Sequence, residues 1–185
     1  MRGILAITAC FIVGMAPRPG RAGDPVRADW VIRNGLVVDG SGRPGVKADV
    51  ALRGDRIVAV GRFDADPKAR VIDANGLVVA PGFIDLHTHS DEGVSKPKLR
   101  ENANYLTQGV TMVVTGNCGS GPVDAAAFFR TVERGGYGSN VIHLLPHGSL
   151  RHAVIGDADR PPTSAELAKM KALAARAMDA GAWGM

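Results

Sequence analysis

The sequence has few cysteines, no long apolar segment, and no internal repeat or low-complexity stretch. Its only cysteines are Cys10 and Cys118, among 185 residues. Cys10 lies in a segment that we interpret as a leader, so the mature chain would keep one thiol and form no internal disulfide. The apolar stretch from Ile4 to Met15 is shorter than the roughly 20 residues of a membrane span. We therefore expect a globular protein without a membrane span.

Excess positive charge is nearly absent once the N-terminal residues are set aside. The whole chain has a formal net charge of +4 at pH 7. Three of its arginines, Arg2, Arg18 and Arg21, lie within the first 22 residues, which contain no acidic residue, and removing them leaves a net charge of +1. This balance gives no reason to expect a nucleic-acid or membrane-surface partner.

The first 22 residues have the layout of a secretory signal peptide. A basic start precedes the apolar run, and the residues up to Ala22 are small, proline-rich and basic. We expect cleavage after Ala22 and a periplasmic or secreted protein. A lipid anchor at Cys10 is one alternative, and an N-terminal strand or helix is another.

Short β-branched runs separated by turn dipeptides fill residues 23–80. Asn34-Gly35, Gly54-Asp55 and Asn75-Gly76 each stand between two such runs. Dipeptides of this kind are typical of tight turns between antiparallel strands. We expect a small β module of hairpins, with the chemistry of the protein elsewhere.

From Pro81 onwards, strands alternate with helices, which predicts a parallel sheet with right-handed crossovers. Thr163 can cap the last helix, with Glu166 reciprocating three residues later. The predicted strands are Phe83 to Leu86, Val110 to Thr115 and Asn140 to Leu145, the predicted helices are Pro97 to Gln108, Val123 to Arg134 and Thr163 to Gly181, and Ala182 begins a fourth strand.

A closed (β/α)₈ barrel takes about 250 residues, whereas residues 81–185 supply three βα units and the beginning of a fourth. We therefore interpret residues 81–185 as the N-terminal part of a TIM-like barrel, truncated at Met185. A complete three-layer α/β domain is the alternative. An apolar end directly after a helix does not favour it.

His87 and His89 follow the first predicted barrel strand and are one residue apart. Side chains alternate along a strand, so both imidazoles point to the same side, toward the active-site mouth of a barrel. Two neutral imidazoles suit Zn²⁺, and Asp85 and Asp91 are placed to orient or adjoin them. Two ordinary histidines are the alternative, which the surrounding apolar strand argues against.

Cys118 ends the next strand within the glycine-rich run from Thr115 to Gly121. A thiolate at this place can ligate the same metal as the histidines of the adjacent strand. A buried structural cysteine and a nucleophile with a histidine base are the alternatives. The adjacent strand ends and the missing disulfide partner favour ligation.

His147 and Arg151 are the candidate substrate-binding residues. His147 lies in the expected exit loop of the third strand and can meet substrate or metal, and Arg151 can hold a carboxylate. A solvated loop arginine is the alternative for Arg151. His143 is interpreted as a packed core histidine, and no catalytic acid or base is assigned within the chain.

Several motifs resemble a known family. The run from Val78 to Asp91, VVAPGFIDLHTHSD, resembles the first-strand signature of the amidohydrolase superfamily. Within it, four further segments resemble the N-acyl-D-amino-acid deacylases, or D-aminoacylases: Gln108 to Thr111, Gly116 to Gly119, His147 to Ser149, and Gly181 to Met185. The resemblance runs from about Trp30 to the last residue.

This resemblance implies a β-sandwich domain, built from both ends of a longer chain, attached to a barrel that holds one or two Zn²⁺ ions. By position, His87 and His89 correspond to a histidine pair at one metal position, and Cys118 corresponds to the cysteine ligand of the deacylases. Two later histidines and a proton-shuttling aspartate are expected beyond Met185.

The resemblance also implies an activity: metal-activated water cleaves the amide bond of a small N-acylated D-amino acid. Selectivity for the D configuration rests on the resemblance alone. Related members act on D-dipeptides or on other linear and cyclic amides. A non-catalytic remnant with half a metal site, and a cysteine hydrolase that pairs Cys118 with His147, remain alternatives.

Overall fold

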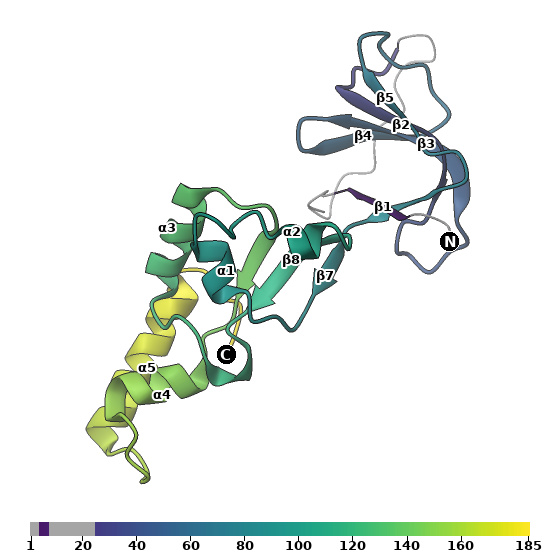
Figure 1. The fold of residues 1–185 in the computed structure, drawn as a ribbon. Helices are drawn as coiled ribbons and strands as arrows, with labels where there is room; N and C mark the ends of the chain where they lie inside the picture. Colours follow the sequence, from purple (N-terminus) through teal and green to yellow (C-terminus); the bar gives the residue numbers. More distant parts are fainter. Residues whose placement is uncertain (1–3, 8–24) are drawn as a thin grey trace. The chain divides into compact units, whose positions relative to one another are not determined.

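The computed structural model describes residues 4–7 and 25–185 of the chain. The chain divides into two compact units, Met1–Gly82 and Phe83–Met185, which we call the β module and the α/β unit (Figure 1).

Strand β1 (Ile4–Ile7) belongs to the predicted leader and pairs in parallel with β6 (Val78–Pro81). A strand here is one of the alternatives that the sequence leaves open for these four residues. The predicted cleavage site at Ala22 and the lipid-anchor alternative at Cys10 lie outside the described residues.

The strands of the β module form one hydrogen-bonded sheet. Besides β1 and β6, they are β2 (Trp30–Val37), β3 (Val46–Arg53), β4 (Arg56–Gly61) and β5 (Arg70–Asp73). The order along the sheet is β1-β6-β2-β3-β4, and β5 also pairs with β2. Strands β3 and β4 are antiparallel, which confirms the hairpin predicted at Gly54-Asp55. Two stacked sheets are not seen among the described residues of this unit.

The other two predicted hairpin turns are wrong. Asn34-Gly35 lies inside β2 at a register shift, and Asn34 has a left-handed φ of 64°. A Cβ on Gly35 would lie 2.5 Å from the Val79 side chain. The dipeptide therefore forms a bulge packed against β6, where only glycine fits. Asn75-Gly76 connects β5 with β6, but both strands pair in parallel with β2 and not with each other.

The α/β unit holds a parallel sheet of three strands with helices between them. Its elements are β7 (Phe83–Asp85), α1 (Asp91–Ser95), α2 (Ala103–Leu106), β8 (Val110–Thr115), η1 (Asn117–Gly119), α3 (Ala125–Gly135), β9 (Asn140–His143), α4 (His147–Ile155) and α5 (Ser164–Asp179). The parallel order β7-β8-β9 confirms the predicted sheet. The predicted capping box is also confirmed, because Thr163 accepts from the Glu166 N–H and Glu166 accepts from the Thr163 N–H.

The helix predicted over Pro97 to Gln108 is wrong. Within this range only α2 is helical, because α1 ends at Ser95, and Asn102 directly before α2 has a left-handed φ of 53°. A left-handed residue cannot continue a right-handed helix. Helix α4 was not predicted, although Pro146 before it and Gly156 after it are typical boundary residues.

Residues 182–185 form no regular strand but extend the sheet edge beside β9. The Trp183 N–H donates to the His143 carbonyl at 3.0 Å, and the Leu145 N–H donates to the Gly184 carbonyl at 2.8 Å. The predicted fourth strand is thus represented by two backbone hydrogen bonds.

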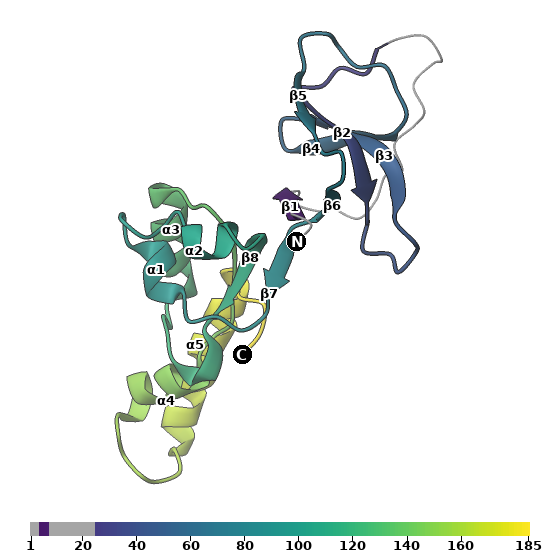
Figure 2. The same ribbon diagram turned by 45° about the vertical axis from the view of Figure 1, so that its right-hand side comes forward.

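Apolar side chains of the helices cover one face of this sheet. Val113 of β8 packs with Val94 of α1 and with Phe128 and Val132 of α3. Figure 2 shows these helices on the same side of the sheet. Among the described residues, no helix combines the length and apolarity needed to cross a membrane.

Candidate metal site

Three side chains that can ligate a metal converge beyond the ends of β7 and β8. The ligand atoms of His87, His89 and Cys118 all lie within 4.8 Å of one another, and all three residues are exposed. His87 Nε2 lies 3.1 Å from Cys118 Sγ, and the two imidazole centroids are 5.6 Å apart. The structure thus brings together the three residues that the sequence singled out as ligands.

The two histidines point to the same side because the residue between them is anchored on the other side. Thr88 is 2% exposed. Its backbone N–H and its hydroxyl both donate to the Val114 carbonyl, at 3.1 and 2.8 Å. The alternation of a strand therefore continues through this segment, although β7 itself ends at Asp85.

Cys118 is presented by a tight turn after β8. Gly116 and Cys118 both have left-handed φ angles, of 81° and 55°. The Asn117 amide donates to the Val114 carbonyl at 2.8 Å and to the Thr88 carbonyl at 3.3 Å, so it joins the two donor-bearing segments. A non-glycine residue in this conformation costs about 1–2 kcal/mol. Strain of this kind concentrates at functional sites.

The two aspartates expected near the imidazoles contact backbone in the structure. Asp85 Oδ1 accepts from the His87 backbone N–H at 3.1 Å. Asp91 is 9% exposed, and its Oδ1 accepts from the Gly116 N–H at 2.9 Å. Neither bond reaches an imidazole ring, and sequence reasoning gave no indication of the contact with Gly116.

His143 is a core residue, as interpreted from the sequence. It is fully buried, and its ring centroid lies 4.7 Å from that of Phe128. Its two ring nitrogens lie 2.9 Å from Thr115 Oγ1 and 2.9 Å from the Pro122 carbonyl oxygen. Because a carbonyl only accepts, Nε2 carries a proton and donates to Pro122.

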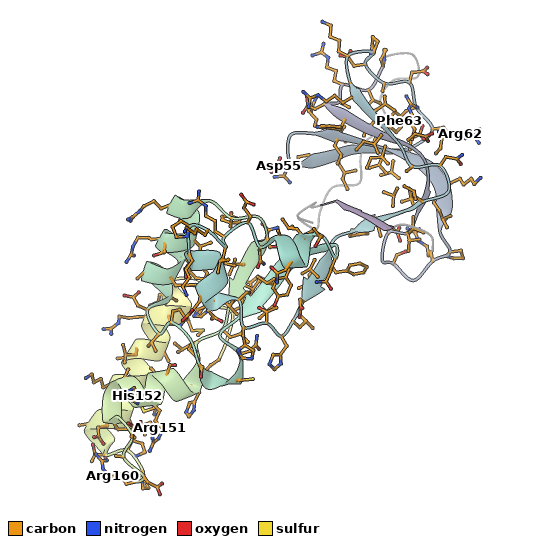
Figure 3. The ribbon with its side chains drawn as sticks, in the orientation of Figure 1. Asp55, Arg62, Phe63, Arg151, His152 and Arg160 are labelled. Atoms are coloured by element: carbon orange, nitrogen blue, oxygen red, sulfur yellow. The ribbon has the colours of Figure 1, made fainter. Side chains whose placement is uncertain are left out.

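The two predicted substrate-binding residues lie on α4. His147 is exposed at the first position of the helix, outside the cluster of three ligands. Arg151 donates through Nη2 to the carbonyls of Ala158, at 2.6 Å, and Arg160, at 3.1 Å. Figure 3 shows Arg151 and Arg160 in this part of the unit. The guanidinium of Arg151 therefore holds the loop between α4 and α5, and its binding of a substrate carboxylate stays a prediction.

The three donors fit a borderline-soft divalent metal. Imidazole nitrogen and thiolate sulfur are the usual ligands of zinc, and on one tetrahedral ion such atoms lie about 3.5 Å apart. The observed separations need only small side-chain adjustments to reach this value.

Comparisons with known proteins identify the family of the chain. The model of the amidohydrolase family matches residues 70–185. The chain is 40% identical to N-acyl-D-aspartate deacylase and 38% identical to D-aminoacylase, both from Alcaligenes xylosoxydans xylosoxydans. The two alignments cover 87% and 85% of this chain but 36% and 37% of the relatives, so the chain spans just over a third of their length.

Solved structures of deacylases are also similar to this chain. A crystal structure of D-aminoacylase is 36% identical, with a TM-score of 0.78 over 84% of this chain and 37% of that one. N-acyl-D-glutamate deacylase from Bordetella bronchiseptica, complexed with zinc and a phosphonate inhibitor, is 35% identical, with a TM-score of 0.77 over 86% of this chain and 38% of that one. The resemblance to the N-acyl-D-amino-acid deacylases is thus confirmed, and the chain belongs to the amidohydrolase family.

Proposed function

We propose that the protein, in its natural length, is a zinc-dependent hydrolase that removes the acyl group from N-acyl-D-amino acids. The observation that carries this proposal is the convergence of His87, His89 and Cys118 beyond two adjacent parallel strands. The relatives named as deacylases of D-amino acids support the substrate class. The substrate would be a small molecule, and no nucleic-acid partner is proposed.

Zinc is the metal that best suits these donors. A related deacylase structure contains zinc, and a D-aminoacylase variant has been crystallised with copper. Bound zinc lowers the pKa of its water ligand to about 7 and polarises a carbonyl group. The residues of this chain would hold one or two such ions, with Asn117 and Thr88 fixing the spacing of the donors.

The rest of the barrel is part of the same proposal. We place the remaining ligands, two histidines and a proton-shuttling aspartate, beyond residue 185 of the natural-length protein, together with the second half of a β-sandwich. His147 is proposed to meet the substrate, because the next residues of α4 contact the Cys118 turn: the Gly121 N–H donates to Ser149 Oγ at 3.2 Å.

The decisive experiment measures metal content and stereoselective hydrolysis together. The natural-length protein should contain stoichiometric zinc and release free amino acid from N-acetyl-D-amino acids but not from the L forms. Cys118→Ala should lose at least one zinc equivalent and most of the activity. Lys171→Ala, an exposed change on α5, serves as the control. A protein that binds no zinc, or that is equally active without Cys118, would refute the proposal.

A cysteine hydrolase is the second candidate, because His87 Nε2 lies 3.1 Å from Cys118 Sγ. A nucleophile with a single histidine base needs only this pair, whereas the structure adds His89 to the same cluster. A metal chelator distinguishes the two candidates. Activity that survives chelation and is lost on alkylation of Cys118 would establish the thiol mechanism.

We also propose that residues 1–22 direct export, with cleavage after Ala22. Cleavage there would remove Ile4–Ile7, the strand β1 that pairs with β6. The N-terminus of the protein recovered from its native host tests this directly. A start at residue 23 supports export, a lipid-modified Cys10 supports anchoring, and a retained Met1 would refute both.

A further inference from the structure

The turn that carries Cys118 is held at both ends by buried polar side chains. At its start, the Gly116 N–H donates to Asp91 Oδ1 at 2.9 Å. At its end, the Pro122 carbonyl oxygen accepts from His143 Nε2 at 2.9 Å. Asp91 is 9% exposed and His143 is fully buried, so the bond of Asp91 is shielded from competing water and that of His143 is partly shielded.

The hydrogen bond of Asp91 lies close in sequence to the metal-ligand candidates on both of its sides. Asp91 follows His89 by two residues, and Gly116 precedes Cys118 by two residues. One charge-assisted hydrogen bond thus joins the histidine segment to the cysteine segment close to the donors on both sides. The Asn117 amide, which donates to the Thr88 carbonyl at 3.3 Å, makes a second and longer connection between the same segments.

The backbone of the turn leaves little freedom to relax if this bond is lost. A Cβ on Gly116 would lie 1.9 Å from the Leu144 carbonyl oxygen, and one on Gly121 would lie 2.9 Å from Asp91 Oδ1. Both glycines have positive φ, of 81° and 143°. The chain therefore passes directly over the Asp91 carboxylate, which fills the inside of the turn.

His143 secures the other end and connects it with the neighbouring strand. Its Nδ1 lies 2.9 Å from Thr115 Oγ1, and Asp91 Oδ1 lies 3.9 Å from the same Nδ1. The ring packs on Phe128, which prevents it from turning away. Asp91, Thr115 and His143 form one buried polar group beneath the turn.

We propose that Asp91 and His143 are positioning residues that set the distance from Cys118 to His87 and His89 before any metal binds. This inference rests on the proposed metal site. Neither residue belongs to the cluster of three donors. Their task is to hold the Gly116–Pro122 turn so that the thiol and the imidazoles need little rearrangement on binding.

The test compares two substitutions of Asp91 in the natural-length protein. Asp91→Ala removes the acceptor, whereas Asp91→Asn keeps an amide oxygen that can accept from the Gly116 N–H. Zinc affinity is measured by competition with a chromophoric chelator. Cobalt-substituted protein reports on Cys118 through its thiolate-to-cobalt absorption. Glu133→Ala, an exposed acidic residue of α3, is the matched control for loss of charge.

Asp91→Ala should bind zinc about 10- to 100-fold more weakly, the usual effect of losing an outer-shell partner, and should weaken the cobalt–thiolate absorption. Asp91→Asn and Glu133→Ala should stay close to the unsubstituted protein. Equal zinc affinity and equal absorption in Asp91→Ala would overturn the inference, even if its thermal stability falls. An Asp91→Asn variant as defective as Asp91→Ala would also overturn it.

A second variant keeps the test decisive if Asp91→Ala does not fold. Ser149→Ala removes the acceptor of the Gly121 N–H at a half-buried site, and should shift zinc affinity and cobalt absorption in the same direction by a smaller amount. No shift would contradict the role of the turn. Absence of metal from the unsubstituted protein would refute the proposed function itself, which distinguishes the two failures.

Discussion

Asp39 of the β module and the buried pair Thr88 and Asp91 of the α/β unit use their side chains in different ways. In the β module, Asp39 accepts from Ser41 and Arg43 at an exposed turn, and all three lie within five consecutive residues. In the α/β unit, Asp91 and Thr88 are buried and bind backbone groups more than twenty residues away. The first arrangement shapes the local chain, whereas the second joins distant segments at the candidate site.

This difference predicts which substitutions lower stability alone and which also weaken metal binding. A lost local bond should cost stability without changing the donor cluster. A lost bond between strand ends should move His87, His89 and Cys118 relative to one another and weaken metal binding.

The largest effect is expected from Gly116→Ala in the α/β unit, with Gly54→Ala in the β module as its counterpart. Gly116→Ala places a Cβ 1.9 Å from the Leu144 carbonyl oxygen, whereas a Cβ on Gly54 meets open space. We expect Gly116→Ala to cost more than about 4 kcal/mol, because backbone overlap adds to the strain of positive φ. Gly54→Ala should cost about 1–2 kcal/mol. Urea unfolding measures both, and similar costs would contradict the comparison.

Core truncations should have the next largest effects. Ile32→Ala in the β module and Leu145→Ala in the α/β unit remove fully buried side chains, and each should cost about 2–5 kcal/mol. Only Leu145→Ala should also weaken zinc binding. The carbonyl group of its neighbour Leu144 packs on Gly116, in the turn that carries Cys118. Unfolding curves and zinc competition on the same samples test this, and weaker zinc binding in Ile32→Ala would argue against it.

A local hydrogen bond within the α/β unit should behave like the local bonds of Asp39 in the β module. Thr163→Ala removes the cap of α5, whose hydroxyl accepts from the Glu166 N–H, and should cost about 1 kcal/mol. Zinc affinity should be unchanged, because the cap lies within one turn of its own helix. Thermal unfolding and zinc titration measure the two quantities, with Thr131→Ala, at an exposed position of α3, as the control.

The smallest effects concern one exposed carboxylate in each unit. Bonds from Ser41 and Arg43 lower the pKa of Asp39 from 3.8 to about 2. Bonds from Arg160 and Thr163 lower the pKa of Glu166 from 4.5 to about 2. A lowered folded-state pKa gives stability that is present above the ordinary pKa and is lost as the pH falls toward about 2.

Asp39→Asn and Glu166→Gln should therefore each reduce the fall in unfolding temperature between about pH 4.5 and pH 2. Added salt should weaken both effects because the groups are exposed. Melting curves from pH 7 to pH 2 check this. An unchanged slope in both variants would show that these bonds do not persist in solution.

Much of the fold could be predicted from local patterns. The hairpin at Gly54-Asp55, the parallel order of the α/β unit and the cap at Thr163 depend on residues close together in sequence. The helix predicted over Pro97 to Gln108 failed because a left-handed Asn102 interrupts an otherwise helical pattern. The turn predicted at Asn34-Gly35 failed because packing against Val79 makes the same dipeptide a bulge.

By itself, the sequence determined the family and the identity of the three metal-ligand candidates, because the spacing of His87 and His89 and the glycine-rich run around Cys118 are local signals. Only the tertiary structure decided that these donors meet within 4.8 Å. It also revealed that Asp91 binds the turn of Cys118 and that Arg151 serves a loop. The physical reason is that these hydrogen bonds depend on which side chains and carbonyl groups of distant segments meet in the folded chain, and no local pattern specifies those pairs.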